Sequence, residues 1–243
     1  MSVGTRPWRD VPRPIRAALV LALGAQFLWH ARLPSPEARA EALPAAPSIG
    51  IARALACGEP AVWAKLAMLW LQAFDTQPGL SLPLRTLDYG RVIDWLALFL
   101  ALDPRAQYPL LAASRIYAEI PVPEKQRQML EFVDRAFHAD PDRRWPWLAH
   151  AVYLARHRLH DERLALRYAE DLAAYATGPG VPDWAKQMRI FVLADLGEVD
   201  AAKVLLGALL ASGTLTDAHE RRFLLLRLQA LEAAGSRAGR SGR

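Results

Sequence analysis

The chain has 243 residues, of which 53% are hydrophobic and 23% charged, and this balance argues against global disorder. Such a length suits one core, or one repeat array preceded by a leader. The formal net charge is +5, but residues 1–16 and the tail from residue 235 each carry an excess of three positive charges, so the residues between them are close to neutral. This distribution predicts no basic stripe on the folded body and argues against a nucleic-acid partner.

Basic residues followed by an apolar stretch open the chain, the order found in export signals and signal anchors. Residues 15–33 would form a helix of roughly 28 Å at about 1.5 Å per residue, close to the hydrocarbon thickness of a bilayer. Because Arg13 and Arg16 precede the apolar run, we expect an anchor whose amino terminus is cytoplasmic. The expected location is a bacterial-type inner membrane, with a single pass and a periplasmic repeat domain.

Two other interpretations of residues 1–33 stay open. In a cleaved signal peptide, the small residues Ala22 and Gly24 would suit a peptidase. Alternatively, the apolar stretch is a helix that packs on the protein's own core or on a partner. The next residues, 34–48, contain four prolines and are predicted to form a semi-rigid spacer with at most one short helix over 37–43.

A repeating pattern fills residues 49–234. A proline-containing turn at Asp103-Pro104 recurs 37 and then 38 residues later, at Asp140-Pro141 and at Gly178-Pro179-Gly180. Apolar faces with 3–4 spacing lie between the turns, which predicts an all-α fold, specifically an α-solenoid of stacked helix pairs. A basic, disordered tail is predicted for residues 235–243. The helices expected in the array are 49–56, 60–74, 87–102, 107–120, 124–139, 145–157, 161–176, 183–196, 199–211 and a last one from a Thr216-Asp217 cap to about Ala234.

The repeats resemble the tetratricopeptide family of helix-turn-helix repeats. Residues 184–210 are the closest match, because Leu196-Gly197-Glu198 is similar to that family's inter-helix turn and Ala201-Ala202 supplies the small residue after it. The Asp-Pro turns are similar to its repeat ending. The resemblance covers about residues 87–213, with units of 37 or 38 residues rather than 34. It implies binding of a protein or peptide in a groove, without catalysis.

An aromatic and basic patch is the first candidate for partner binding. Trp145 and Trp147 follow Arg143 and Arg144, and Trp and Arg are enriched at interface hot spots. The alternative is that the two rings pack between adjacent repeats while the arginines are solvated. Other residues that could line a groove are Arg115, Tyr117, Tyr153, Arg156 and Arg189.

Signatures of other chemistry are missing from the sequence. There is no Gly-x-Ser-x-Gly elbow, phosphate-binding Gly-rich loop or His-Glu-x-x-His motif. His150 and His157 would lie about 10 Å apart along a helix, too far to ligate one metal ion. The sequence therefore favours a non-enzymatic, membrane-anchored scaffold or assembly factor that binds another envelope protein and needs no cofactor or metal. A permanent structural subunit of a membrane complex and an enzyme with an unrecognised site remain the alternatives.

Overall fold

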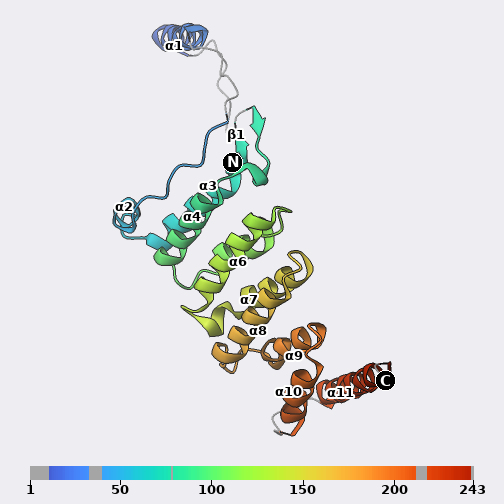
Figure 1. Ribbon diagram of the computed structural model, residues 1–243. Coiled ribbons are helices and arrows are strands. Elements are labelled where there is room, and N and C mark those ends of the chain that lie inside the picture. Colours follow the sequence, from blue (N-terminus) through green and yellow to red (C-terminus); the bar gives the residue numbers. More distant parts are fainter. Residues whose placement is uncertain (1–10, 33–39, 78, 212–217, 242–243) are drawn as a thin grey trace. The chain divides into compact units, whose positions relative to one another are not determined.

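The computed structural model describes residues 11–32, 40–77, 79–211 and 218–241, and Figure 1 shows the course of the chain. Within these residues the ordered structure is helical, apart from the two-residue strands β1 (Thr76–Gln77) and β2 (Leu80–Ser81), which pair with each other. The predicted all-α class is confirmed. The chain divides into two compact units, the first containing residues 1–39 and the second beginning at Ala40.

Helix α1 (Arg13–Arg32) is the helix of the first unit. None of its residues is buried, and large apolar side chains such as Val20, Leu21 and Phe27 are exposed along it. It is long and apolar enough to cross a membrane, as expected from the sequence. Arg6 and Arg9, which contribute to the basic stretch before the apolar run, lie outside the described residues.

The second unit contains the repeat array. Its 3-10 helices are η2 (Ala73–Asp75) and η3 (Leu84–Thr86), and its π-helix is η4 (Ala113–Tyr117). Its α-helices are α2 (Ile49–Leu55), α3 (Pro60–Gln72), α4 (Tyr89–Leu102), α5 (Tyr108–Ala112), α6 (Pro123–Phe137), α7 (Pro141–His157), α8 (Glu162–Tyr175), α9 (Asp183–Asp195), α10 (Val199–Ala211) and α11 (Ala218–Ser241).

Helices of this unit pack mainly on their neighbours in the sequence. From α3 onward the most extensive contacts between α-helices are those of α3 with α4, α4 with α6, and then each helix with the next one as far as α11, while α7 also contacts α5 and α9. Figure 1 follows this order through the colour gradient. Packing between consecutive helices is the defining property of a solenoid, so the predicted solenoid-like stacking is also confirmed.

Local chemistry explains where the helices begin. The Asp88 carboxylate accepts hydrogen bonds from the backbone N–H groups of Gly90 and Arg91 and so caps α4. Prolines occupy the first positions of α3, α6 and α7, where a missing N–H costs nothing. Helix α7 therefore starts at Pro141, four residues before the start predicted from the aromatic patch.

The single α-helix predicted over residues 107–120 is instead a short α-helix followed by a π-helix. Helix α5 gives way after Ala112 to the π-helix η4, which ends as the Ala118 N–H bonds to the Ala113 carbonyl, five residues back, at 2.9 Å. Single π-turns inside helices occur frequently at functional sites. This one carries Arg115.

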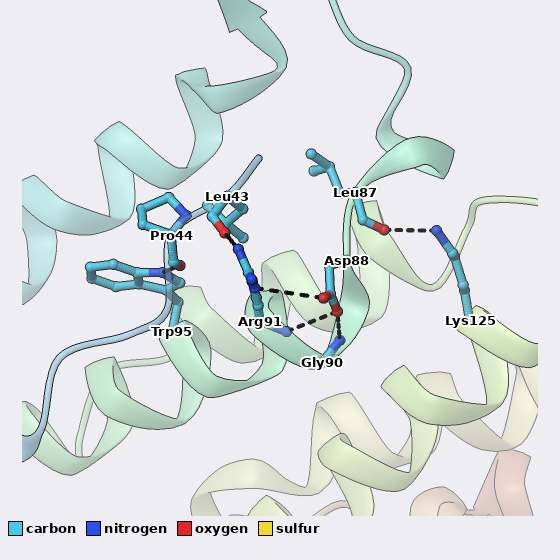
Figure 2. Close-up of polar contacts among 8 residues, drawn as sticks. All are labelled: Leu43, Pro44, Leu87, Asp88, Gly90, Arg91, Trp95 and Lys125. Atoms are coloured by element: carbon cyan, nitrogen blue, oxygen red, sulfur yellow. Dashed lines mark hydrogen bonds and ion pairs between the residues drawn. The ribbon is translucent and has the colours of Figure 1, made fainter. Parts of the chain in front are cut away.

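Residues 40–48, called the strap below, run without helix across α4 (Figure 2). Arg91 donates to the Leu43 carbonyl, and the Trp95 indole N–H donates to the Pro44 carbonyl at 2.9 Å. Leu43 itself is 2% exposed. The strap is thus part of the repeat unit, whereas the sequence predicted a semi-rigid spacer over residues 34–48, separate from the array.

The carboxyl end also differs from expectation. Helix α11 continues to Ser241, although the sequence predicted its end near Ala234 and a disordered tail after it. The segment contains no proline, and its Ala, Arg, Glu and Leu residues favour helix, so α11 continues through Gly235 and Gly239 although glycine disfavours helix. The predicted cap at Thr216 and Asp217 lies outside the described residues.

Candidate functional site

An open pocket of about 430 Å³, the aromatic pocket below, lies where η4, α7 and α9 meet. It contains four of the residues predicted from the sequence, namely Arg115, Trp145, Trp147 and Tyr153. The structure brings them together from segments up to 38 residues apart. Its other lining residues are Pro146, Ala149, His150, Trp184 and Met188.

Helical spacing places these side chains. Trp145, Ala149 and Tyr153 recur every four residues along α7, and Trp184 and Met188 do the same on α9. The rings of Trp145 and Trp184 meet edge to face with centroids 5.4 Å apart. Such aromatic pairs contribute more than their buried area alone. The two helices are therefore joined by the walls of the pocket itself.

Two other contacts hold the walls in place. The Trp147 indole N–H donates to the Gln107 side-chain carbonyl at 2.6 Å, which ties α7 to the turn before α5. The His150 ring stacks on Tyr153 with centroids 5.8 Å apart. Tyr153 and Trp184 nevertheless remain about half exposed, at 50% and 51%. The pocket thus combines fixed walls with aromatic surface that a ligand can cover.

Arg115 is the group among the lining residues that carries a full charge at neutral pH. Burial, followed by the charge of Arg115, lowers the pKa of His150, and Glu119 offsets this only in part. Glu119 lies 3.6 Å from His150 Nε2 and 3.3 Å from Arg158, so it is already paired. In the described part of the chain, no ion pair or hydrogen bond occupies the exposed Arg115 guanidinium. It is available to a carboxylate or a carbonyl of a ligand.

Three predicted residues lie outside the pocket on the surface. Arg143 is ion-paired with Asp140 at 2.9 Å, and Arg156 is paired with Asp195. Arg189 is half-buried on α9, one position after Met188, and does not line the cavity.

The other two predicted residues are core residues, a correction to the sequence-based set. Tyr117 is 2% exposed, packs edge to face on Tyr89 and accepts a hydrogen bond from the Tyr89 hydroxyl at its carbonyl, at 3.0 Å. Arg144 is 5% exposed, because its guanidinium turns inward to backbone carbonyls. Neither presents surface to a partner.

Trp184 and Met188 were missed from the sequence. Their four-residue spacing on α9 was visible, but an apolar pair at that spacing normally marks a core face. Only the packing of α7 on α9 places them opposite Trp145.

A second cavity of about 540 Å³ lies between α3, α4 and the turn before α5. Its walls are mainly apolar, and none of the predicted partner-binding residues lines it. The lining residues are Ala64, Lys65, Met68, Leu69, Phe99, Asp103, Arg105, Ala106, Gln107, Tyr108 and Pro109.

A cluster of titratable groups joins α6 to α8. His138 Nε2 lies 3.6 Å from Asp134 and 3.7 Å from Asp171, and the three potential ligand atoms lie within 4.8 Å of one another. Arg167 approaches Asp134 to 3.8 Å, so a cation already stands beside the two carboxylates. The arrangement is a network of polar contacts, including the Arg167–Asp134 ion pair, that connects neighbouring helices.

Asp134→Asn should stabilise the protein at alkaline pH. Burial and the nearby Asp171 raise the pKa of Asp134 above 3.8, so its charged form is disfavoured in the folded state. An acid with a raised folded pKa reduces stability above that pKa and has no effect below the unfolded value. We expect Tm to rise by roughly 1–3 °C at pH 8 and the difference to vanish towards pH 3. Asp94→Asn, an exposed change on α4, controls for the loss of one negative charge.

No protein-family model, curated protein or solved structure matches this chain. The aromatic pocket and helix α1 are therefore the features of the chain that bear on its function.

Proposed function

We propose that this protein is a non-enzymatic, membrane-anchored scaffold or assembly factor that binds a segment of another envelope protein in the aromatic pocket. The observation that carries the proposal is the convergence of Arg115, Trp145, Trp147 and Tyr153 on one open cavity. These residues come from two elements, and Trp184 from a third completes the wall.

The chemistry of the pocket suits a peptide segment better than a small polar metabolite. Trp, Tyr and Arg are the residue types that dominate binding energy at protein interfaces. Aromatic walls give contact area to an apolar or proline-containing segment, and one unpaired guanidinium fixes its direction through a carboxylate or carbonyl. Preformed walls reduce the ordering cost of binding.

Helix α1 supports the membrane part of the proposal. A tether confines the pocket and its partner to the same membrane, which raises their effective concentration, so a weak pocket is sufficient. We place α1 in an inner membrane as a single pass, with the repeats on the periplasmic side, since the basic residues before the apolar run favour a cytoplasmic amino terminus.

The pocket is tested by in-cell crosslinking of a tagged, full-length chain, followed by detergent extraction and quantitative mass spectrometry. Arg115→Ala with Trp184→Ala should reduce capture of the partner at least about tenfold, because each hot-spot truncation costs roughly 2 kcal/mol. Arg143→Ala with Tyr175→Ala removes the same kinds of exposed groups elsewhere and should leave capture unchanged. Equal capture by both double variants would remove the pocket from the proposal.

The alternative is a permanent structural subunit of a membrane complex, favoured by the exposed apolar side chains along all of α1. Replacing residues 1–33 by an unrelated single-pass anchor separates the two functions. A scaffold keeps its partner after this exchange, because the tether is preserved. A structural subunit loses the complex, because α1 no longer packs on its neighbours.

A further inference from the structure

The outer side of α3 is apolar, although α3 begins the stacked array. Val62, Leu66 and Leu69 recur at 3–4 spacing and are 51%, 62% and 61% exposed. The opposite side of the same helix, with Ala64, Met68 and Leu71, is buried in the core. A terminal repeat of a solenoid normally carries a polar outer face that keeps it soluble. The outer side of the first repeat is mainly apolar instead, and contiguous exposed apolar surface is typical of an interaction site.

Helix α2 adds further exposed apolar side chains next to α3. Ile51 and Leu55, one turn apart, are 56% and 58% exposed, and α2 packs on α3. We name the set the terminal face and define it by Ile51, Leu55, Val62, Leu66, Leu69 and the flanking Trp70, where Leu69 also borders the second cavity. The α2–α3 pair is apolar enough for a membrane span, but it is bent by 102°. With 13 residues, α3 alone measures about 20 Å, too short to cross a bilayer core of about 30 Å.

The charges around the terminal face fit an anionic lipid surface. Residues 49–72 contain Arg53 and Lys65 against one acid, Glu59. Arg53 and Lys65 are exposed, and neither is ion-paired within the described residues. Trp70, 40% exposed, is of the type that concentrates where headgroups meet acyl chains. Apolar side chains flanked by basic ones and a tryptophan are typical of helices that lie in the membrane interface.

The covalent chain brings this face to a membrane. Seven residues separate Arg32 from Ala40, so the eight Cα–Cα steps between them, fully extended, reach at most about 29 Å. Beyond Ala40 the strap is fastened to α4 through Leu43 and Pro44, and α4 packs on α3. If α1 spans a bilayer, the covalent chain therefore keeps the first repeat within this reach of that bilayer. A lipid surface is always present there, whereas a second copy or a partner helix would have to be recruited.

We propose that the terminal face docks on the lipid headgroup–acyl boundary of the bilayer that α1 spans, with α2 and α3 lying in the interface. This inference rests on the membrane anchor of the proposed function and is independent of the aromatic pocket. Docking on lipid fixes the first repeat against the membrane, which orients the rest of the array relative to it.

Cys57 provides the test without disturbing the fold. It is the single cysteine of the sequence, it is exposed, and it lies in the turn between α2 and α3. The full-length chain is labelled there with an NBD fluorophore and reconstituted into vesicles of phosphatidylethanolamine and phosphatidylglycerol, with or without brominated acyl chains. In the Cys57→Ser background, Val20→Cys marks α1 and Glu170→Cys marks exposed α8.

The expected result is a blue-shifted label at position 57 whose emission brominated lipid reduces at least about twofold, since interfacial helices bury their apolar face roughly 5–10 Å deep. The label at position 170 should respond to neither. Leu66→Glu with Leu69→Glu changes two exposed side chains, so it should keep the helical circular dichroism and abolish the quenching at position 57.

Each other outcome overturns the inference in a distinguishable way. Quenching at position 20 with a water-like label at position 57 leaves the anchor in place and removes the interfacial docking. A blue-shifted but unquenched label at position 57 means that protein, either a second copy or a partner, covers the face. No quenching at position 20 contradicts the membrane anchor of the proposed function itself.

Discussion

Arg144→Ala should lower the free energy of unfolding by about 2–4 kcal/mol, although Arg144 belongs to the patch that the sequence offered as a binding surface. Its guanidinium donates to the Ala136 carbonyl at 2.6 Å and to the Pro104 carbonyl at 3.0 Å. One buried side chain therefore links the turn after α4, the end of α6 and the start of α7. Truncation leaves both carbonyls without this donor and opens a cavity. Urea unfolding followed by circular dichroism measures the loss.

The neighbouring arginine is the matched control. Arg143 is exposed and pairs with Asp140, so Arg143→Ala should change stability by no more than about 0.5 kcal/mol. If Arg144→Ala were as mild as Arg143→Ala, the inward-facing guanidinium would not join the repeats as described.

Trp95→Ala should be the second large effect, with a loss of about 3–5 kcal/mol, the range for removal of a buried aromatic ring. The Trp95 ring packs against Trp70, Phe99 and Trp63 at centroid distances of 5.0, 5.7 and 6.5 Å, and its indole N–H holds the Pro44 carbonyl. The loss should appear in Tm and in faster hydrogen exchange throughout the first repeat.

Trp95→Phe separates the ring from the hydrogen bond. It keeps most of the packing, so the global loss should be about 1 kcal/mol. Exchange at the backbone amides of the strap should accelerate selectively, because the Pro44 carbonyl has lost its donor. An unchanged strap in Trp95→Phe would mean that Arg91 and the buried Leu43 suffice to hold it.

The aromatic pocket could be predicted only in part. Trp145, Trp147 and Tyr153 share one helix, and spacing along a helix is readable from sequence. Arg115 belongs to a π-turn, and Trp184 lies on α9, opposite Trp145 of α7. The positions of Arg115 and Trp184 in the pocket therefore depend on how consecutive repeats pack. Arg144 was misjudged for a related reason. The sequence does not distinguish Arg143 from Arg144. Arg144 is the buried one because it reaches the Ala136 and Pro104 carbonyls.

The repeat architecture was easier to predict than its edges. Proline turns 37 and 38 residues apart, with apolar 3–4 spacing between them, leave few alternatives to stacked helix pairs. The prolines of residues 34–48 predict a spacer because proline suppresses helix, and residues 40–48 are indeed not helical. The sequence does not show that the Leu43 side chain is buried. Nor does it show that the carbonyls of Leu43 and Pro44 accept hydrogen bonds from Arg91 and Trp95. Contacts between an extended segment and a helix about 50 residues away leave no local pattern in the sequence.

Site-specific photocrosslinking tests the central claim, that the aromatic pocket binds a protein segment, most directly. A benzophenone amino acid replaces Tyr153 in the pocket or, as the matched control, Tyr175 on α8, which is equally exposed at 53%. We expect a discrete crosslinked protein from position 153, its loss with Arg115→Ala and Trp184→Ala, and no such product from position 175. The same products from both positions, or none from position 153 in cells that contain the intact membrane-bound chain, would contradict it.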